Sequence, residues 1–313
     1  MSDNQLLRIG SSGGTVAVLA LDIGATKFAA GLVDRAGRVG SVRRVPVPAE
    51  GVWQACAGLL RAVAAGAAVT AVGIGSAGPV DVPAGITRAL NIPEWRDGFA
   101  IVAAVAELFP GATVRFALDG ACLALAEQHS GVLRGLRNGL AMTVSSGIGG
   151  GILVDGRVSV GRTGNAGHIG HLVVPGWDVP CACGGSGCLE AVASGISSAR
   201  WAREQGWSGE TGAELARDAR AGDAIARAAL ARAGTALGTA IGSAAALLDV
   251  DTVVIGGGFA DSGELLWAPL RAAAARHAGL DFIRGLRVEA SRLAEGATLH
   301  GAAVLAAGLS GSA

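Results

Sequence analysis

The chain has 313 residues, of which 51% are hydrophobic and 16% are charged, which is enough for one large domain or two medium ones with a filled core. Its 25 Lys and Arg residues balance 25 Asp and Glu residues, so no basic excess is available to bind nucleic acid or an anionic membrane. The 51 glycines are more than twice the usual fraction of about 7%, yet they show no triplet period. A disordered chain, a collagen-like chain and a mainly nucleic-acid-binding protein are therefore excluded.

The beginning of the chain and its apolar stretches indicate where the protein works. Residues 1–14 lack the basic and apolar regions of a signal peptide, so we expect a short flexible tail and a cytoplasmic location. The uncharged stretches 62–80 and 233–248 are rich in small residues and shorter than the roughly 20 residues of a membrane span. We interpret both as buried core segments, and we expect no membrane partner.

Apolar patterns in the first half alternate between strand and helix periods. Strands are predicted at residues 15–23, 27–33 and 39–47, a helix at 53–68, a strand from 70, a helix at 99–109 and a short strand at 113–117. The last of these strands delivers Asp119 to its C-terminal end. The predicted order is β-β-β-α-β-α-β.

The second half repeats this order. It predicts a strand at 139–144, a glycine turn at 145–151, a returning strand at 152–157 with a turn at Asp155-Gly156, helices at 195–204, 212–220 and 223–248, a strand at 252–255 and a further helix. An α/β fold with two similar domains facing one another across a ligand cleft is expected from this repetition.

Three glycine-containing loops follow apolar strands, at residues 22–27, 145–151 and 256–258. Glycine lets the backbone approach a ligand and present bare N–H groups, which phosphate oxygens accept well. Any one loop alone is equally explained by a hairpin turn that needs glycine, but the three together favour a phosphate site. Asp22 in the first loop can hold Mg²⁺. Neither the Rossmann nor the P-loop spacing is present, which argues against dinucleotide binding and P-loop chemistry.

Three of the five cysteines, Cys181, Cys183 and Cys188, lie within eight residues, with His171 ten residues upstream. An odd number of cysteines so distributed does not form a disulfide framework. Three thiolates and one imidazole suit tetrahedral Zn²⁺, and with no open fourth position the metal is expected to be structural. The alternative is a set of free thiols.

Asp119 has two interpretations. Phosphoryl transfer needs a base for the attacking hydroxyl, and a carboxylate at a strand end is suited to that role. The helical pattern that starts directly after it also suits a helix N-cap, which spacing alone favours.

The sequences DIGATK, SSGIGGG, VIGGG and GNAGHIGH with the downstream CLE resemble the ROK family, part of the superfamily of sugar kinases and actin, over about residues 18–307. The resemblance implies two actin-like (ribonuclease H-like) ATPase domains around a central cleft. We expect an N-terminal domain of residues 15–121 plus 298–313, and a C-terminal domain of residues 122–297 with a zinc-binding segment at 168–190. The resemblance also implies that ATP binds with Mg²⁺ near Asp22. The nucleotide contacts it implies are Gly24, Thr26, Lys27, Ser146, Gly147, Gly256 and Gly257.

The same resemblance implies that Asp119 is the general base and that the sugar contacts Gly78, Asn91, Asp119, His168, His171 and Glu190. The chain departs from the family pattern at Leu118 and Ala121, where family kinases carry Asn, and at His168, where most carry Glu. The histidine form is similar to bacterial N-acetylmannosamine kinases. A neutral imidazole offers one donor and one acceptor where a carboxylate offers only acceptors.

The expected function is an ATP-dependent kinase for the 6-hydroxyl of a hexose or N-acylhexosamine. N-acetylmannosamine stands slightly ahead of glucose, and a sugar-like cyclitol is a further candidate. A ROK-type repressor is disfavoured because only about 15 residues precede the first strand, and a non-catalytic sugar sensor is the other alternative. Besides the sugar, the expected partner is a second copy of the chain, in a homodimer or homotetramer.

Overall fold

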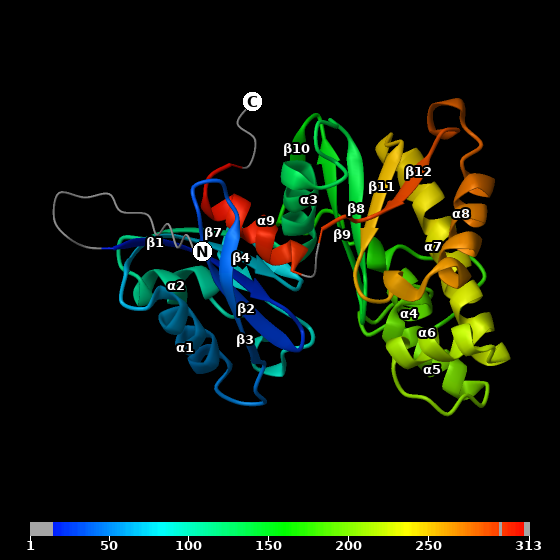
Figure 1. The fold of residues 1–313 in the computed structure, drawn as a ribbon, viewed down its shortest axis with the longest axis horizontal. Helices are drawn as coiled ribbons and strands as arrows, with labels where there is room; N and C mark the ends of the chain where they lie inside the picture. The colour runs from blue at the N-terminus through cyan, green and yellow to red at the C-terminus, as the bar shows by residue number, and fades with distance from the viewer. Residues whose placement is uncertain (1–14, 294–295, 310–313) are drawn as a thin grey trace, which may run out of the picture. The chain divides into compact units, whose positions relative to one another are not determined.

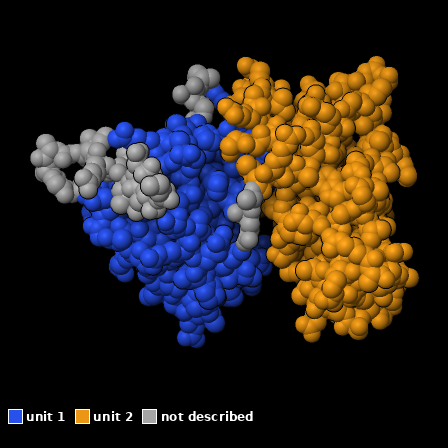
Figure 2. Space-filling view, viewed as in Figure 1, with its two compact units in different colours: residues 1–129, 157–166, 296–313 blue, residues 130–156, 167–295 orange. Residues whose placement is uncertain are grey.

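The structure is a computed structural model that describes residues 15–293 and 296–309. The flexible tail predicted for residues 1–14 lies outside the described residues. The chain divides into two compact units, shown in blue and orange in Figure 2. Unit 1 comprises Met1–His129, Arg157–Ala166 and Gly296–Ala313, and unit 2 comprises Ser130–Gly156 and Gly167–Glu295.

The sheet of unit 1 has the strand order β3-β2-β1-β4-β7 (Figure 1). Strands β1, β4 and β7 run parallel, while β2 pairs antiparallel with both β1 and β3. The carboxyl ends of β1, β4 and β7 therefore meet at one edge of the sheet. The strands are β1 (Val16–Ile23), β2 (Lys27–Val33), β3 (Val39–Pro46), β4 (Ala68–Ser76) and β7 (Thr113–Leu118).

Helices pack on this sheet and complete its core. They are α1 (Val52–Ala64), α2 (Ile101–Leu108), α3 (Asp119–Ser130) and α9 (Ala297–Ala306), with the short elements β5 (Val80–Asp81), β6 (Ile86–Thr87) and η1 (Pro93–Trp95). The first helix is shorter than the predicted 53–68, because Ala65 and Gly66 both take positive φ and end it. Helix α9 reaches the sheet closely: a Cβ on Gly73 would lie 2.0 Å from the Ala302 carbonyl oxygen.

The second sheet has the order β10-β9-β8-β11-β12. Its strands are β8 (Gly139–Val144), β9 (Ile148–Val154), β10 (Arg157–Ser159), β11 (Thr252–Gly256) and β12 (Arg287–Ala290). Strands β8, β11 and β12 are parallel, and β9 pairs antiparallel with β8. The predicted turn at Asp155-Gly156 is present, with positive φ at both residues as a two-residue hairpin turn requires.

The prediction of a single glycine turn over residues 145–151 is wrong in its second part. The glycines at 149–151 belong to β9, where they pair with Thr143, Met142 and Ala141 of β8. The physical reason is a close approach of neighbouring backbone, since a Cβ on Gly150 would lie 2.9 Å from the Ala141 carbonyl oxygen and 3.1 Å from that of Gly167. Only residues 145–147 form the loop.

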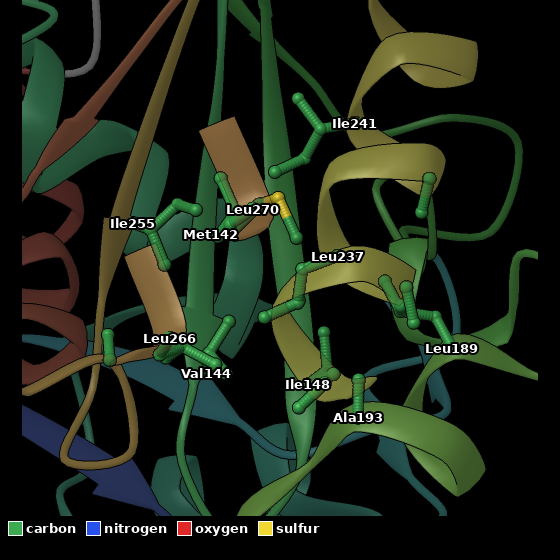
Figure 3. Packing of buried hydrophobic residues seen from close by; sticks show 14 of the residues in the cluster. Met142, Val144, Ile148, Leu189, Ala193, Leu237, Ile241, Ile255, Leu266 and Leu270 are labelled. Carbon is green, nitrogen blue, oxygen red and sulfur yellow. The ribbon is translucent and has the colours of Figure 1, made fainter. Parts of the chain in front are cut away.

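The helices of unit 2 are α4 (Leu189–Ala193), α5 (Gly195–Glu204), α6 (Gly212–Ala221), α7 (Ala224–Leu248) and α8 (Glu264–His277), with the short turns η2 (Ile169–His171), η3 (Ala260–Ser262) and η4 (Asp281–Ile283). Side chains from β8, β9, α4 and α7 form one apolar cluster that includes Met142, Ile148, Leu189 and Leu237 (Figure 3). Among the described residues, no helix combines the length and the hydropathy needed to cross a bilayer.

Candidate functional site

The first predicted phosphate loop is the tight turn between β1 and β2. The Gly24 N–H donates to the Lys27 carbonyl oxygen over 3.2 Å, and a Cβ on Gly24 would lie 3.0 Å from that oxygen. Thr26 and Lys27 are exposed. The turn thus places a short stretch of backbone and the Lys27 side chain next to the last residues of β1.

The parallel pairing of β1, β4 and β7 brings together two carboxyl groups that are far apart in the sequence. Asp22 pairs with Gly75, and Gly75 pairs with Ala117, two residues before Asp119. Burial, and after it the charge of Asp119, raise the pKa of Asp22 to about 7. A site that disfavours negative charge on Asp22 is suited to a bound divalent cation.

Two cations oppose this pKa shift, and only one was predicted to lie at the site. The charges of Lys27 and Arg44 both lower the pKa of Asp22. Arg44 on β3 stands in the same cross-strand row as Asp22, because both pair with Ala29 of β2. The sequence analysis missed Arg44, because a β-bulge between Ala30 and Leu32 shifts the β2–β3 register, and counting from the turn would place Arg43 opposite Ala29.

Asp119 is the first residue of α3, and its Oδ1 accepts the Gly120 N–H over 2.6 Å. This contact is to the next residue, whereas a capping side chain accepts the N–H two or three residues further on, so it does not by itself support the N-cap interpretation. The two positions at which the chain departs from the family pattern, Leu118 and Ala121, are 2% and 1% exposed and pack in the core of unit 1. They offer no polar side-chain atom to a sugar.

The predicted sugar-contact residues Gly78 and Asn91 are held near each other, since the Leu90 N–H donates to the Gly78 carbonyl oxygen over 3.3 Å. Asn91 is exposed. Trp95, four residues further on, is fully buried between Phe28 and Phe99, at ring distances of 5.7 and 4.6 Å. Trp95 is therefore a packing anchor for the segment that carries Asn91.

Asn165 fixes the strand that follows Gly78, a role the sequence analysis did not assign. Its side-chain amide accepts the Val80 N–H over 2.9 Å and donates to the Val80 carbonyl oxygen over 2.6 Å. The residue lies within the GNAGHIGH motif. An Asn in that motif was visible in the sequence, but its partner, 85 residues away, was not.

The second and third predicted phosphate loops lie at neighbouring strand ends in unit 2. Gly256 at the end of β11 pairs with Thr143 of β8, and a Cβ on Gly257 would lie 2.6 Å from the Val144 carbonyl oxygen. In the loop after β8, the Ser145 N–H donates to the Gly147 carbonyl oxygen over 2.9 Å. Ser146 at the apex is exposed. The glycine loops of this unit are thus brought side by side.

His168 and His171 come from the segment between β10 and α4, and Glu190 comes from α4 itself. The rings of His168 and His171 lie 5.7 Å apart. Burial, followed by the charge of His171, lowers the pKa of His168, so this imidazole is neutral at pH 7. Glu190 lies in α4, and its Oε2 accepts the Ile148 N–H over 2.8 Å.

The four predicted metal ligands converge. The ligand atoms of His171, Cys181, Cys183 and Cys188 all lie within 4.8 Å of one another. The Cys183 and Cys188 sulfurs are 3.6 Å apart, and the Cys181 sulfur is 3.8 Å from His171 Nδ1. Ligands about 2.3 Å from a tetrahedral ion are separated by about 3.8 Å, so this arrangement fits a single metal ion.

Comparison with known proteins identifies the family. The ROK family model matches residues 18–308. The glucokinase of Thermotoga maritima is 33% identical over 307 residues, covering 91% of this chain and 96% of the relative. The N-acetylmannosamine kinase of Salmonella typhi is 33% identical over 242 residues, covering 76% of this chain and 82% of the relative.

A solved structure supports the same assignment. The ROK family glucokinase of Streptomyces griseus, in complex with glucose and AMPPNP, has a TM-score of 0.80 and 32% identity, and the match covers 93% of this chain and 99% of that one. This similarity confirms the predicted α/β fold of the actin-like ATPase class. The chain belongs to the ROK family.

Proposed function

We propose that this protein is an ATP-dependent carbohydrate kinase that transfers the γ-phosphoryl group of ATP to the 6-hydroxyl of a hexose or N-acylhexosamine. The observation that carries the proposal is the pair Asp22 and Asp119 at one sheet edge, beside a glycine turn and the cations Lys27 and Arg44. The glucokinase and N-acetylmannosamine kinase relatives support the reaction class.

In this proposal the chain's residues align ATP with the sugar, neutralise the charge of the phosphates and deprotonate the sugar hydroxyl. Asp119 takes the proton of the sugar hydroxyl as its oxygen attacks the γ-phosphorus, and ADP leaves. Backbone N–H groups around Gly24, Ser146, Gly147 and Gly257 bind phosphate oxygens, and Lys27 adds positive charge. Mg²⁺ supplies further neutralisation of the phosphates, and Asp22 is the residue that would hold it.

We further propose that His171, Cys181, Cys183 and Cys188 bind one structural Zn²⁺. The spacing of their ligand atoms and the soft thiolate chemistry support this choice. The ion would hold the segment 172–188, in which Gly184 and Gly187 take positive φ. All residues of this segment are described, and none of them is helical. Free thiols without a metal are the alternative.

The choice of sugar is the finer part of the proposal. N-acetylmannosamine is placed ahead of glucose because His168 replaces an acceptor-only carboxylate with a neutral ring that both donates and accepts. Buried Leu118 offers no polar contact where family kinases carry Asn, so it changes how a sugar is recognised without favouring either one. Glucose and a cyclitol remain the alternatives, with Gly78, Asn91 and Glu190 as the other proposed contacts.

The test is a coupled assay of ADP release with glucose, mannose, N-acetylmannosamine, N-acetylglucosamine and a cyclitol. We expect turnover with at least one of them, and the highest kcat/KM with N-acetylmannosamine. Absence of turnover with every sugar, in protein that binds a sugar, would favour the non-catalytic sensor.

The role of His168 has its own test. Replacing His168 with Glu should move the ratio of kcat/KM for glucose to that for N-acetylmannosamine toward glucose by at least about tenfold, or ~1.4 kcal/mol. An equal decrease in kcat/KM for both sugars, or a wild type that already prefers glucose, would mean that Glu190 and Asn91, and not His168, determine the specificity.

We place the enzyme in the cytoplasm as a homodimer or homotetramer. A reducing compartment fits the five cysteines, all of which are free thiols in the structure. The balanced charge supports a small-molecule substrate over nucleic acid or a membrane. Light scattering of the purified protein tests the oligomeric state.

A further inference from the structure

The loop after β8 is attached to the rest of unit 2 at both of its ends. On one side, the Gly195 N–H at the start of α5 donates to the Ser145 carbonyl oxygen over 2.8 Å. On the other side, Glu190 Oε2 accepts the Ile148 N–H over 2.8 Å. Ser146 and Gly147, the residues with the proposed phosphate-binding N–H groups, lie between these two attachments.

The Glu190 carboxylate lies directly against the loop backbone. A Cβ on Gly147 would be 2.6 Å from Glu190 Oε2. A Cβ on Gly170 would in turn be 2.1 Å from the Ile148 carbonyl oxygen. At Gly170 the backbone therefore leaves no space for a side chain, and at Gly147 a side chain would have to displace the Glu190 carboxylate or the loop.

Both partners of the Glu190–Ile148 hydrogen bond are fixed by apolar packing. The Ile148 side chain is buried in the core cluster of unit 2, and so is Leu189, the residue before Glu190 (Figure 3). The backbone at Ile148 and at the start of α4 is therefore held by the same core. The hydrogen bond thus transmits the position of α4, which begins directly after the proposed metal ligand Cys188, to the loop.

A glycine-containing loop needs such an external attachment. Its backbone has more conformations to lose than other loops, so N–H groups that must point at a phosphate are held at a cost in entropy. A carboxylate that accepts a backbone N–H forms a charge-assisted hydrogen bond, which is stronger than a neutral one. This attachment is made before any ligand binds.

We propose that Glu190 is a positioning residue for the nucleotide: through the Ile148 N–H it holds the loop 145–148 in the conformation that binds phosphate. The inference rests on the proposed kinase function and adds to it, because the family resemblance assigns Glu190 to the sugar alone. The acceptor oxygen performs this role. The negative charge itself lies near the phosphates and does not favour them.

The test compares two substitutions of Glu190 in the full-length chain. Glu190→Gln keeps an oxygen that can accept the Ile148 N–H, whereas Glu190→Leu keeps the approximate shape and removes the acceptor. The probe is AMPPNP with Mg²⁺, titrated by calorimetry in the absence of sugar. We expect Glu190→Leu to weaken nucleotide binding by at least about tenfold, and Glu190→Gln to stay within about threefold of wild type. Glu107→Leu, an exposed change on α2, is the control for loss of a carboxylate.

A second variant addresses the case in which Glu190→Leu does not fold. Gly147→Ala keeps Glu190 and places a methyl group 2.6 Å from its Oε2, so the carboxylate or the loop must move. Either movement should break the Glu190–Ile148 hydrogen bond and weaken AMPPNP binding to a similar degree. Nucleotide affinity unchanged in Gly147→Ala or in Glu190→Leu overturns the inference, as does an equal loss in Glu190→Gln and Glu190→Leu. An increase in KM confined to the sugar also overturns it.

The outcome is separable from that of the proposed function. Wild-type protein that binds no AMPPNP and phosphorylates no sugar refutes the kinase proposal itself. Wild-type protein that is an active kinase, with nucleotide binding insensitive to the loss of the Glu190 acceptor, refutes only the positioning role.

Discussion

The raised pKa of Asp22 predicts that the ligand-free protein becomes less stable as the pH rises toward neutrality. Burial and the charge of Asp119 raise this pKa from 3.8 to about 7. Between these two values the folded protein binds a proton at Asp22 that the unfolded chain has already released. Stability contributed by the protonated carboxyl is therefore present below pH 4, falls as the pH rises through the interval, and levels off above about pH 7.

The magnitude follows from the size of the shift. About three pKa units at ~1.4 kcal/mol each amount to about 4 kcal/mol across the whole interval. More than half of this falls between pH 5 and pH 8. The substitution Asp22→Asn removes the titrating group and should remove this part of the pH dependence.

The assay is urea denaturation of wild type and Asp22→Asn at half-unit steps from pH 5 to pH 8, without Mg²⁺ or nucleotide. The free energy of unfolding of the variant minus that of wild type should increase with pH by about 2–3 kcal/mol. Asp119→Asn should reduce the pH dependence without abolishing it, because burial is the larger cause of the shift. Asp155→Asn, on the exposed hairpin turn, serves as the control.

Parallel pH profiles for wild type and Asp22→Asn would refute the reasoning. They would mean that Asp22 ionises at its ordinary pKa, and that water or the cations Lys27 and Arg44 compensate for its burial and for Asp119.

Three further predictions concern the base, the metal and the packing of α9. Asp119→Asn should keep the fold and lower kcat by about 10²–10⁴-fold, and near wild-type turnover would reduce Asp119 to a helix cap. Metal analysis should find one zinc per chain, and Cys183→Ser should lower the Tm. If the purified protein contains no zinc, and its Tm and activity are the same with and without Cys183→Ser, the structural-metal account is wrong. Gly301→Ala should destabilise the protein by about 1–3 kcal/mol or more, because its Cβ would lie 1.7 Å from the Cys122 carbonyl oxygen. Gly58→Ala in α1, with open space around it, should be neutral or slightly stabilising in thermal denaturation, and equal effects of the two changes would refute the packing argument.

Local patterns in the sequence were sufficient for most of the elements. The alternation of apolar residues predicted strands close to β1, β2, β7, β8 and β11, because side-chain periodicity is a property of the strand itself. The order of strands and helices then indicated the α/β class. The metal cluster was also visible, since three of its four ligands lie within eight residues and their chemistry matches.

At the three glycines 149–151, the local sequence pattern predicts the wrong structure. As a run of glycines they indicate a turn, yet they lie in β9 and pair with β8, and at Gly150 neighbouring carbonyl oxygens crowd the position that a Cβ would take. That crowding comes from Ala141 and Gly167, on other segments. Composition alone carries no information about it.

What only the tertiary structure decided is which distant residues act on one another. Asp22 and Asp119 are 97 residues apart in sequence, and the parallel pairing of β1, β4 and β7 brings their charges close enough to shift a pKa. Glu190 and Ile148 are 42 residues apart, and their hydrogen bond depends on the shared core beneath them. Sequence patterns determine how each segment folds locally, whereas strand order and core packing are cooperative properties of the whole unit. The electrostatics of the site and the attachment of its loop follow from those properties.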